Sequence, residues 1–164
     1  MAGGRCCAAL VFLSGALAPA YAACPIELAV YSDHEKAAEI DFTPTMASAM
    51  ATNSFRMILD NDDVLDGTVT WSEGTNRPNG ALMYNCPDGG VAGAELAACT
   101  LWEGVIYTVD ETGAVGLLPG QGKPAPKTLV LTNLGPSLRQ SKAYGPNGFS
   151  TLPWDAFSLS GCQE

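Results

Sequence analysis

The chain has 164 residues, of which 47% are hydrophobic and 15% are charged, and its formal net charge is −9 at pH 7. This length suits one domain with one hydrophobic core. The excess of acidic side chains repels phosphate groups, so the composition argues against binding of nucleic acid or of an anionic membrane surface.

Residues 1–22 have the features of a secretory signal peptide. A positive charge precedes an apolar run over 6–18, a proline follows it, and Ala20 and Ala22 fit the A-x-A pattern of a cleavage site. The run is shorter than the about 20 residues that cross a bilayer, so we expect no transmembrane segment in the mature chain. We therefore expect cleavage after Ala22 and export of a single domain over 23–164.

Cys24 lies close enough to this cleavage site to raise the question of a lipid anchor. Processing directly before Cys24 would place Tyr21 three residues upstream of the cut, where lipoprotein signals carry a small or aliphatic side chain. We therefore expect no lipid on Cys24. The alanine-rich leader favours export to a bacterial periplasm or secretion.

Short segments of the mature chain alternate between apolar and polar residues, which is the pattern of half-buried β-strands. The clearest examples are AEIDFT and GTVTWS. Strands are expected over 26–31, 38–43, 54–59, 67–72, 81–84, 102–109, 128–132 and 156–160. The segment 102–109 is apolar on both faces and is therefore predicted to be a central strand.

Clusters of Gly, Pro, Asn and Asp separate these strands and predict turns or loops. They lie at 60–67, 77–80, 86–90, 110–113, 119–127 and 145–148. Short helices are expected over 45–51, 93–99 and 136–141. The regular spacing of strands and turns predicts a mainly β fold, an antiparallel β-sandwich or barrel with one to three short helices.

Four cysteines remain after the signal peptide is removed, an even number that favours two disulfides in an oxidising compartment. We expect Cys86 to pair with Cys99, and Cys24 to pair with Cys162 and tie the two ends of the domain together. A structural zinc site is disfavoured because no C-x-x-C pair is present and the only histidine is not spaced with any cysteine as a zinc finger requires.

Motifs that would identify an enzyme are scarce. His34, which lies between Asp33 and Glu35, is the one side chain whose ordinary pKa suits a general base near neutral pH. No G-x-S-x-G motif accompanies it, and neighbours on a strand point to opposite faces, so Asp33 is poorly placed to orient His34. An exposed turn histidine is the expected reading. The sequence also lacks phosphate-loop, zincin and thioredoxin-type motifs, and we expect no cofactor.

Four carboxylates cluster in DNDDVLDG, and such a cluster raises the question of a calcium site. They are Asp60, Asp62, Asp63 and Asp66. The spacing does not fit the EF-hand, because the glycine is the eighth residue of the segment and not the sixth. A polar hairpin turn explains the same residues, and the sequence leaves calcium open while predicting no metal site.

Basic side chains concentrate between 112 and 154, a stretch without acids. We consider Arg77, Arg139 and Lys142, together with Lys123 and Lys127, as a candidate basic face for carboxylate or phosphate groups. The alternative is that these bases only offset acids within the fold.

Two functional hypotheses follow from the sequence. The first is a non-catalytic binding or interaction module of the cell envelope, whose partner is an envelope protein or an anionic glycan. The second is a small secreted hydrolase that uses Asp and Glu residues, with His34 as a further candidate. A panel of esterase, glycosidase and peptidase substrates distinguishes them.

Overall fold

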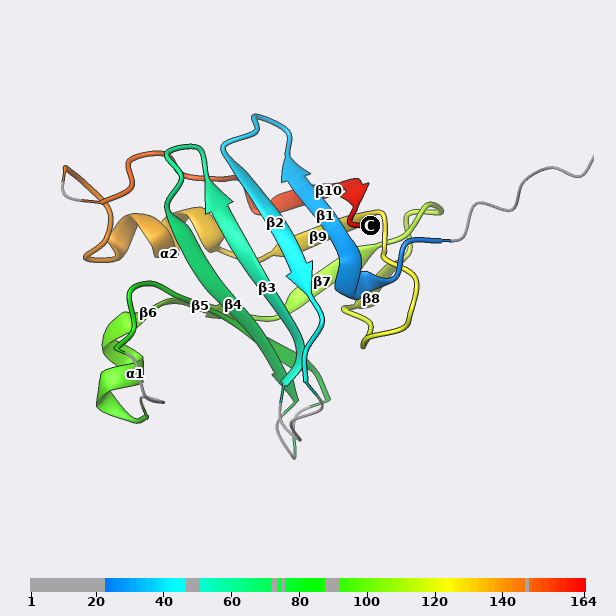
Figure 1. The fold of residues 1–164 in the computed structure, drawn as a ribbon, viewed down its shortest axis with the longest axis horizontal. Coiled ribbons are helices and arrows are strands. Elements are labelled where there is room, and N and C mark those ends of the chain that lie inside the picture. The colour runs from blue at the N-terminus through cyan, green and yellow to red at the C-terminus, as the bar shows by residue number, and fades with distance from the viewer. Residues whose placement is uncertain (1–22, 47–50, 72–73, 75, 88–91, 147) are drawn as a thin grey trace, which may run out of the picture.

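A computed structural model of the chain describes residues 23–46, 51–71, 74, 76–87, 92–146 and 148–164. These residues form ten strands in one antiparallel sheet, with two short α-helices (Figure 1). The strands are β1 (Ala29–Asp33), β2 (Ala38–Thr43), β3 (Ala51–Leu59), β4 (Val64–Trp71), β5 (Pro78–Met83), β6 (Thr100–Gly104), β7 (Ile106–Val109), β8 (Val115–Leu117), β9 (Thr128–Leu131) and β10 (Ala156–Cys162). The helices are α1 (Ala94–Cys99) and α2 (Leu134–Gln140), and a single 3₁₀ turn, η1 (Ile26–Leu28), precedes β1. The predicted mainly β class is confirmed, and its form is a single curled sheet that makes half a barrel.

The strand order in the sheet is β6-β5-β4-β3-β2-β1-β10-β9-β7-β8. Strands β1 to β5 are joined in sequence, each antiparallel to the next. The C-terminal strand β10 then pairs with β1, with a bulge between Val30 and Tyr31. The last strand of the domain therefore lies in the middle of the sheet, beside the first.

The chain between β6 and β7 bends at Val105 and links the two ends of the curled sheet. Strand β6 pairs with β5 at one end of the order, whereas β7 pairs with β9 and β8 at the other. The prediction of one central strand over 102–109 is therefore wrong. The segment is apolar on both faces because the curl brings it against the core, where Trp102 and Ile106 are both buried.

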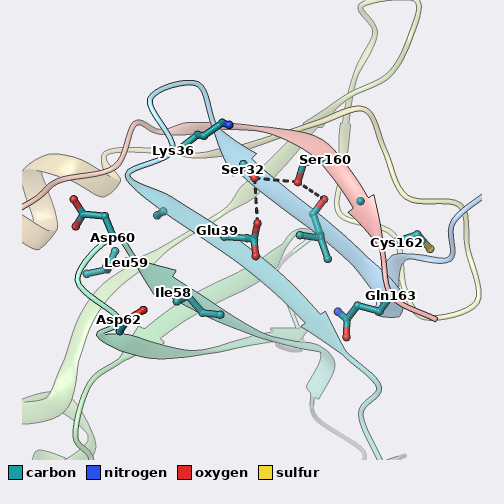
Figure 2. A pocket seen from close by; sticks show the side chains of 13 residues that line it. Ser32, Lys36, Glu39, Ile58, Leu59, Asp60, Asp62, Ser160, Cys162 and Gln163 are labelled. Carbon is teal, nitrogen blue, oxygen red and sulfur yellow. Dashed lines mark hydrogen bonds between the residues drawn. The ribbon is translucent and has the colours of Figure 1, made fainter.

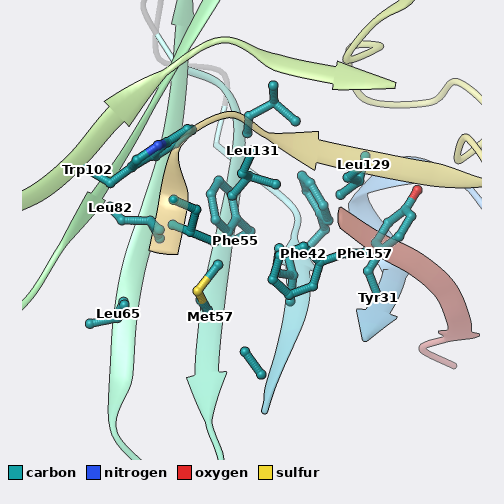
Figure 3. Close-up of a cluster of buried hydrophobic side chains, with 14 of the residues drawn as sticks. Tyr31, Phe42, Phe55, Met57, Leu65, Leu82, Trp102, Leu129, Leu131 and Phe157 are labelled. Atoms are coloured by element: carbon teal, nitrogen blue, oxygen red, sulfur yellow. The ribbon is translucent and has the colours of Figure 1, made fainter. Parts of the chain in front are cut away.

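The concave face of the sheet holds the core (Figure 3). Alternate residues of β2, β3 and β4 point inward, as the period-two pattern predicts. The labelled side chains in Figure 3 are Tyr31, Phe42, Phe55, Met57, Leu65, Leu82, Trp102, Leu129, Leu131 and Phe157. Gly67 is required where the Phe55 ring lies over β4, because a Cβ there would stand 2.3 Å from the ring. The volume inside the curl is therefore filled by side chains.

Several local expectations differ from the structure. Residues 77–80 were predicted as a turn, but Pro78 begins β5, a position where its missing N–H is tolerated. The predicted strand over 26–31 starts as the 3₁₀ turn η1 and becomes extended only at Ala29. Most of the helix expected over 45–51 falls outside the described residues, and Ala51 belongs to β3. Strand β8 was not predicted, because its residues are exposed and do not alternate.

Two disulfides join the expected pairs, Cys24 to Cys162 and Cys86 to Cys99, with Cα–Cα distances of 5.8 and 5.3 Å. Such bonds persist in oxidising, extracytoplasmic environments, which is the location they indicate for this domain. The expected signal peptide lies outside the described residues. No helix in the part of the chain that the structure describes is long and apolar enough to cross a membrane.

Candidate functional site

His34 lies in the turn that follows β1, with its side chain 64% exposed. Its ring packs edge-on against Trp154 at a centroid distance of 4.8 Å, and its Nε2 is 3.8 Å from Glu35 Oε1. The structure therefore places His34 as the exposed turn residue that the sequence predicts.

Asp33 does not orient His34. Its side chain is 3% exposed and turns away from the histidine, into the end of the sheet. Oδ1 accepts a hydrogen bond from the backbone N–H of Ala38 at 3.2 Å, and Oδ2 accepts one from the N–H of Trp154 at 3.4 Å. This carboxylate holds the β1–β2 turn against the segment before β10, so its role is structural.

The acidic cluster divides between a turn and a strand. Asp60, Asp62 and Asp63 lie in the β3–β4 turn, whereas Asp66 belongs to β4 and faces Arg56 on β3. Asp63 accepts hydrogen bonds from the Tyr84 hydroxyl at 2.8 Å and from Asn61 Nδ2 at 2.7 Å. The bond to Asp63 also raises the pKa of the Tyr84 hydroxyl.

Donors from the protein therefore engage both carboxylate oxygens of Asp63. Asp60 likewise accepts a hydrogen bond from the Thr151 hydroxyl at 2.9 Å. Nowhere in the described residues do three or more His, Cys, Asp or Glu side chains form a group that could hold a metal ion.

One hollow lies on the convex face of the sheet, over β1, β2, β3 and β10 (Figure 2). We call it the outer-face groove; its volume is about 560 Å³. Its polar side chains include Ser32, Lys36, Glu39 and Ser160. The Ser32 hydroxyl lies 3.0 Å from that of Ser160 and 3.4 Å from a Glu39 oxygen. These groups bond to one another, and the lining strands are all internal to the sheet.

A second set of hollows lies beside β6, where α1 and α2 flank it. Three adjoining hollows of about 440, 290 and 500 Å³ all share Leu101 of β6 in their lining. We call them together the β6–α2 groove. Their lining residues from α1 and α2 are mostly small or polar, namely Glu95, Ala97, Ala98, Ser137 and Gln140. Lys142 follows α2 and lines two of the three hollows.

Strand β6 gives this groove a feature that the outer-face groove lacks. In the described part of the chain, β6 pairs with β5 on one side and has no strand partner on the other. The unpaired side faces α2, whose Ser137 lines the same hollows as Thr100 and Leu101. A strand edge offers main-chain N–H and C=O groups as well as side chains.

The predicted basic residues do not form one face. Lys142 lines the β6–α2 groove, and Arg139 lies nearby on the exposed side of α2. Arg77 precedes β5 at the opposite end from Tyr84 and donates to the Tyr107 hydroxyl at 3.4 Å. Since β5 spans roughly 20 Å, Arg77 lies far from Lys142. The loop that carries Lys123 and Lys127 lies on the other side of the domain from α2 (Figure 1).

Comparisons of this chain with protein-family models, with curated proteins and with solved structures found no match. The fold and the grooves are therefore the basis for a functional proposal. Sequence reasoning missed β6 as an edge strand, because the pattern of 102–109 is that of a strand buried on both faces. One residue in the sequence could have indicated a break in this strand, namely Gly104, because glycine inside a strand often marks a bend or a close approach. In the structure, an added Cβ at Gly104 would stand 2.8 Å from the Trp102 ring.

Proposed function

We propose that this chain is a non-catalytic interaction module of the cell envelope and that the β6–α2 groove binds a protein partner. The observation that carries the proposal is the set of hollows beside β6, lined by Leu101, by small side chains of α1 and α2, and by the charged residues Glu95, Glu103 and Lys142. The two disulfides support an extracytoplasmic site of action. An anionic glycan is less well supported, because the five candidate bases are dispersed over the domain.

The hydrolase hypothesis lacks a comparable observation. The Asp33 carboxylate is engaged by two backbone N–H groups, and His34 contacts Trp154 and Glu35 rather than a nucleophile. An activity assay with ester, glycoside and peptide substrates tests this hypothesis directly. If the wild type hydrolyses one of these substrates and His34→Ala does not, the result would favour an enzyme over an interaction module.

Site-specific photo-crosslinking tests the proposed binding site. A benzophenone amino acid is placed at Ser137 in the groove and, as a matched control, at Thr68 on the convex face of β4, and both proteins are expressed in cells that make the native envelope. We expect a discrete protein adduct from position 137 and none from 68. Adducts of equal yield from both positions, or from neither, would contradict a protein-binding groove.

A further inference from the structure

We infer that the hollow of about 500 Å³ in the β6–α2 groove binds a small zwitterion with an apolar side chain, the chemistry of a free aliphatic amino acid or a short apolar peptide. We call this hollow the Tyr84 hollow. Such a ligand is separate from the protein partner proposed above. Three features of the hollow point to it, namely the bonded walls, the apolar floor and two opposite charges at the rim.

The walls of the Tyr84 hollow come from segments that are distant in sequence and are bonded to one another. They are the chain after β5, helix α1, strand β6 and the chain after α2. The Cys86–Cys99 disulfide joins the first two walls, and the Tyr84 N–H donates to the Cys99 carbonyl at 2.9 Å. Phe149 holds the last wall, because its N–H donates to the Ala143 carbonyl at 3.1 Å and its ring packs edge-on against Tyr84. The hollow is therefore formed before a ligand enters, which lowers the ordering cost of binding.

The floor of the hollow is apolar. It includes the half-buried Leu101 of β6 and the buried, disulfide-bonded Cys99. The Tyr84 hydroxyl donates to Asp63 at 2.8 Å, so the polar tip of this side chain already has a partner. Ala98 of α1 is small and leaves the volume open. A hollow of this size and lining suits an aliphatic side chain, whose burial supplies the hydrophobic part of the affinity.

Two opposite charges stand at the rim of the same hollow. Glu95 of α1 and Lys142 after α2 both line it, and both residues are exposed. Within the described part of the chain neither makes an ion pair, so their charged atoms lie more than 4.0 Å apart. Glu103 lines the adjoining hollow of about 290 Å³ and not this one. The charges at the Tyr84 hollow are therefore balanced, one of each sign.

A zwitterion is the ligand that satisfies both charges. Its carboxylate would accept a hydrogen bond from Lys142 Nζ, and its ammonium group would donate one to the Glu95 carboxylate. A ligand with a single charge would satisfy one of these residues and bring a like charge near the other. An α-amino acid carries both groups beside its side chain, whereas a dipeptide carries them at its two ends, so the width of the gap decides which of the two fits better.

An NMR titration of the ¹⁵N-labelled, oxidised mature chain with leucine and with leucyl-leucine tests the inference near neutral pH. We expect one of these zwitterions to bind with a Kd below about 1 mM and to shift the amides of Leu101 and Ala143. The analogues that lack one charge, 4-methylpentanoate and 3-methylbutylamine, are expected to bind about fivefold more weakly or worse. Equal binding of a zwitterion and of either analogue would overturn the assignment, as would the absence of binding by both zwitterions at about 10 mM.

Charge variants test the two residues at the rim. Glu95→Gln and Lys142→Gln are each expected to weaken binding of the zwitterion about fivefold. Glu103→Gln and Lys127→Gln are the matched controls for net charge, because neither residue lines the Tyr84 hollow. Lys142→Gln is not expected to weaken binding of 3-methylbutylamine, which has no carboxylate. Loss of affinity that is equal in the rim variants and in the controls would show a general effect of charge and would overturn the site.

A variant that fills the hollow tests its location. Ala98→Phe is expected to weaken binding at least about tenfold, because the added ring takes the place of the ligand. Ala94→Phe is the matched control, since Ala94 is exposed on the same helix but lines none of the three hollows. Equal affinity of the two variants would place the ligand elsewhere and overturn the inference. Ser137 lines the other two hollows and not this one, so crosslinking from position 137 judges the protein partner separately.

Discussion

The indole Nε1 of Trp102 and the carbonyl oxygen of Thr132 are 2.9 Å apart, and this hydrogen bond joins β6 to the segment that leads from β9 into α2. Trp102 belongs to β6, whereas Thr132 follows β9, and these two strands lie at different places in the curled sheet. The bond therefore holds the open side of the half-barrel at a fixed width. It also sets the distance between β6 and α2, on which the proposed groove depends.

Trp102→Phe is expected to lower the free energy of unfolding by about 1–2 kcal/mol. The substitution keeps a ring in the core but leaves the Thr132 carbonyl without this donor, and it removes part of the packed volume. Urea denaturation monitored by circular dichroism measures the change. Trp154→Phe is the control, since Trp154 is 53% exposed and its loss is expected to cost less than about 0.5 kcal/mol.

Lys36 occupies the left-handed backbone region at φ +57°, at the end of the turn in which its N–H donates to the Asp33 carbonyl. Lys36→Gly relieves this strain, which raises the free energy of unfolding by about 1–2 kcal/mol. Glycine also gives the unfolded chain more conformational freedom, which lowers the free energy of unfolding by about 0.5–1 kcal/mol. We expect a net gain in the free energy of unfolding of about 0.5–1 kcal/mol. Glu35→Gly is the control, because Glu35 is the neighbouring residue and has no positive φ. If Lys36→Gly lowered the free energy of unfolding as much as Glu35→Gly does, this account would be contradicted.

Asp110 caps the β7–β8 turn. Its Oδ1 accepts hydrogen bonds from the Thr112 hydroxyl and N–H and from the Ala114 N–H, and these bonds hold the pKa of the carboxyl below its ordinary value of 3.8. Because the folded-state pKa is depressed, the stabilisation is complete above about 3.8 and is lost as the pH falls through the lower, folded value.

We therefore expect the protection of the β8 amides, corrected for the intrinsic exchange rate at each pH, to fall on acidification below pH 3.8, before that of the rest of the sheet does. Asp110→Asn is expected to remove this pH dependence of β8 exchange while leaving the β2–β3 pair unaffected. Hydrogen exchange followed by mass spectrometry over Val115–Leu117 measures both. Equal pH dependence in the wild type and the variant would contradict the assignment to Asp110.

The strands that could be predicted from sequence are those whose two faces meet different environments. In β2, Ile40 and Phe42 are buried while Glu39 is exposed, so burial follows the period-two pattern directly. That pattern depends only on neighbouring residues of one strand, so it can be recognised in the sequence. The disulfide pairing was also accessible, because the ends of a compact domain lie close together and the Cys86–Cys99 loop is short.

The site could not be predicted in the same way, because it depends on contacts distant in sequence. Gly104 alone precedes the bend at Val105, with no cluster of turn residues, so 102–109 resembles one buried strand, although its halves lie near opposite ends of the strand order. Basic residues that cluster between 123 and 142 are separated in space by the path of β9 and α2 (Figure 1). Only Lys142 reaches the groove.

The two disulfides are expected to contribute unequally to the stability of the domain. The chain-entropy estimate gives about 3 kcal/mol for the loop closed by Cys86–Cys99 and about 5 kcal/mol for the much longer loop closed by Cys24–Cys162. We expect the Cys24→Ser, Cys162→Ser variant to lose more global stability than the Cys86→Ser, Cys99→Ser variant. Thermal unfolding of both variants measures this order.

The shorter bond is expected to have a local effect in addition. Helix α1 has six residues, its N-cap Gly93 makes no side-chain cap, and a helix of this length is not stable alone. Without Cys86–Cys99, the hydrogen bonds that join α1 to its neighbours are those from the Tyr84 N–H to the Cys99 carbonyl and from the Thr100 hydroxyl to the Leu96 carbonyl. The amide of Ala97, which bonds to Gly93, should therefore lose its exchange protection while the β2–β3 pair keeps its own. Protection of Ala97 equal to that in the wild type would show that α1 is held by packing rather than by the disulfide.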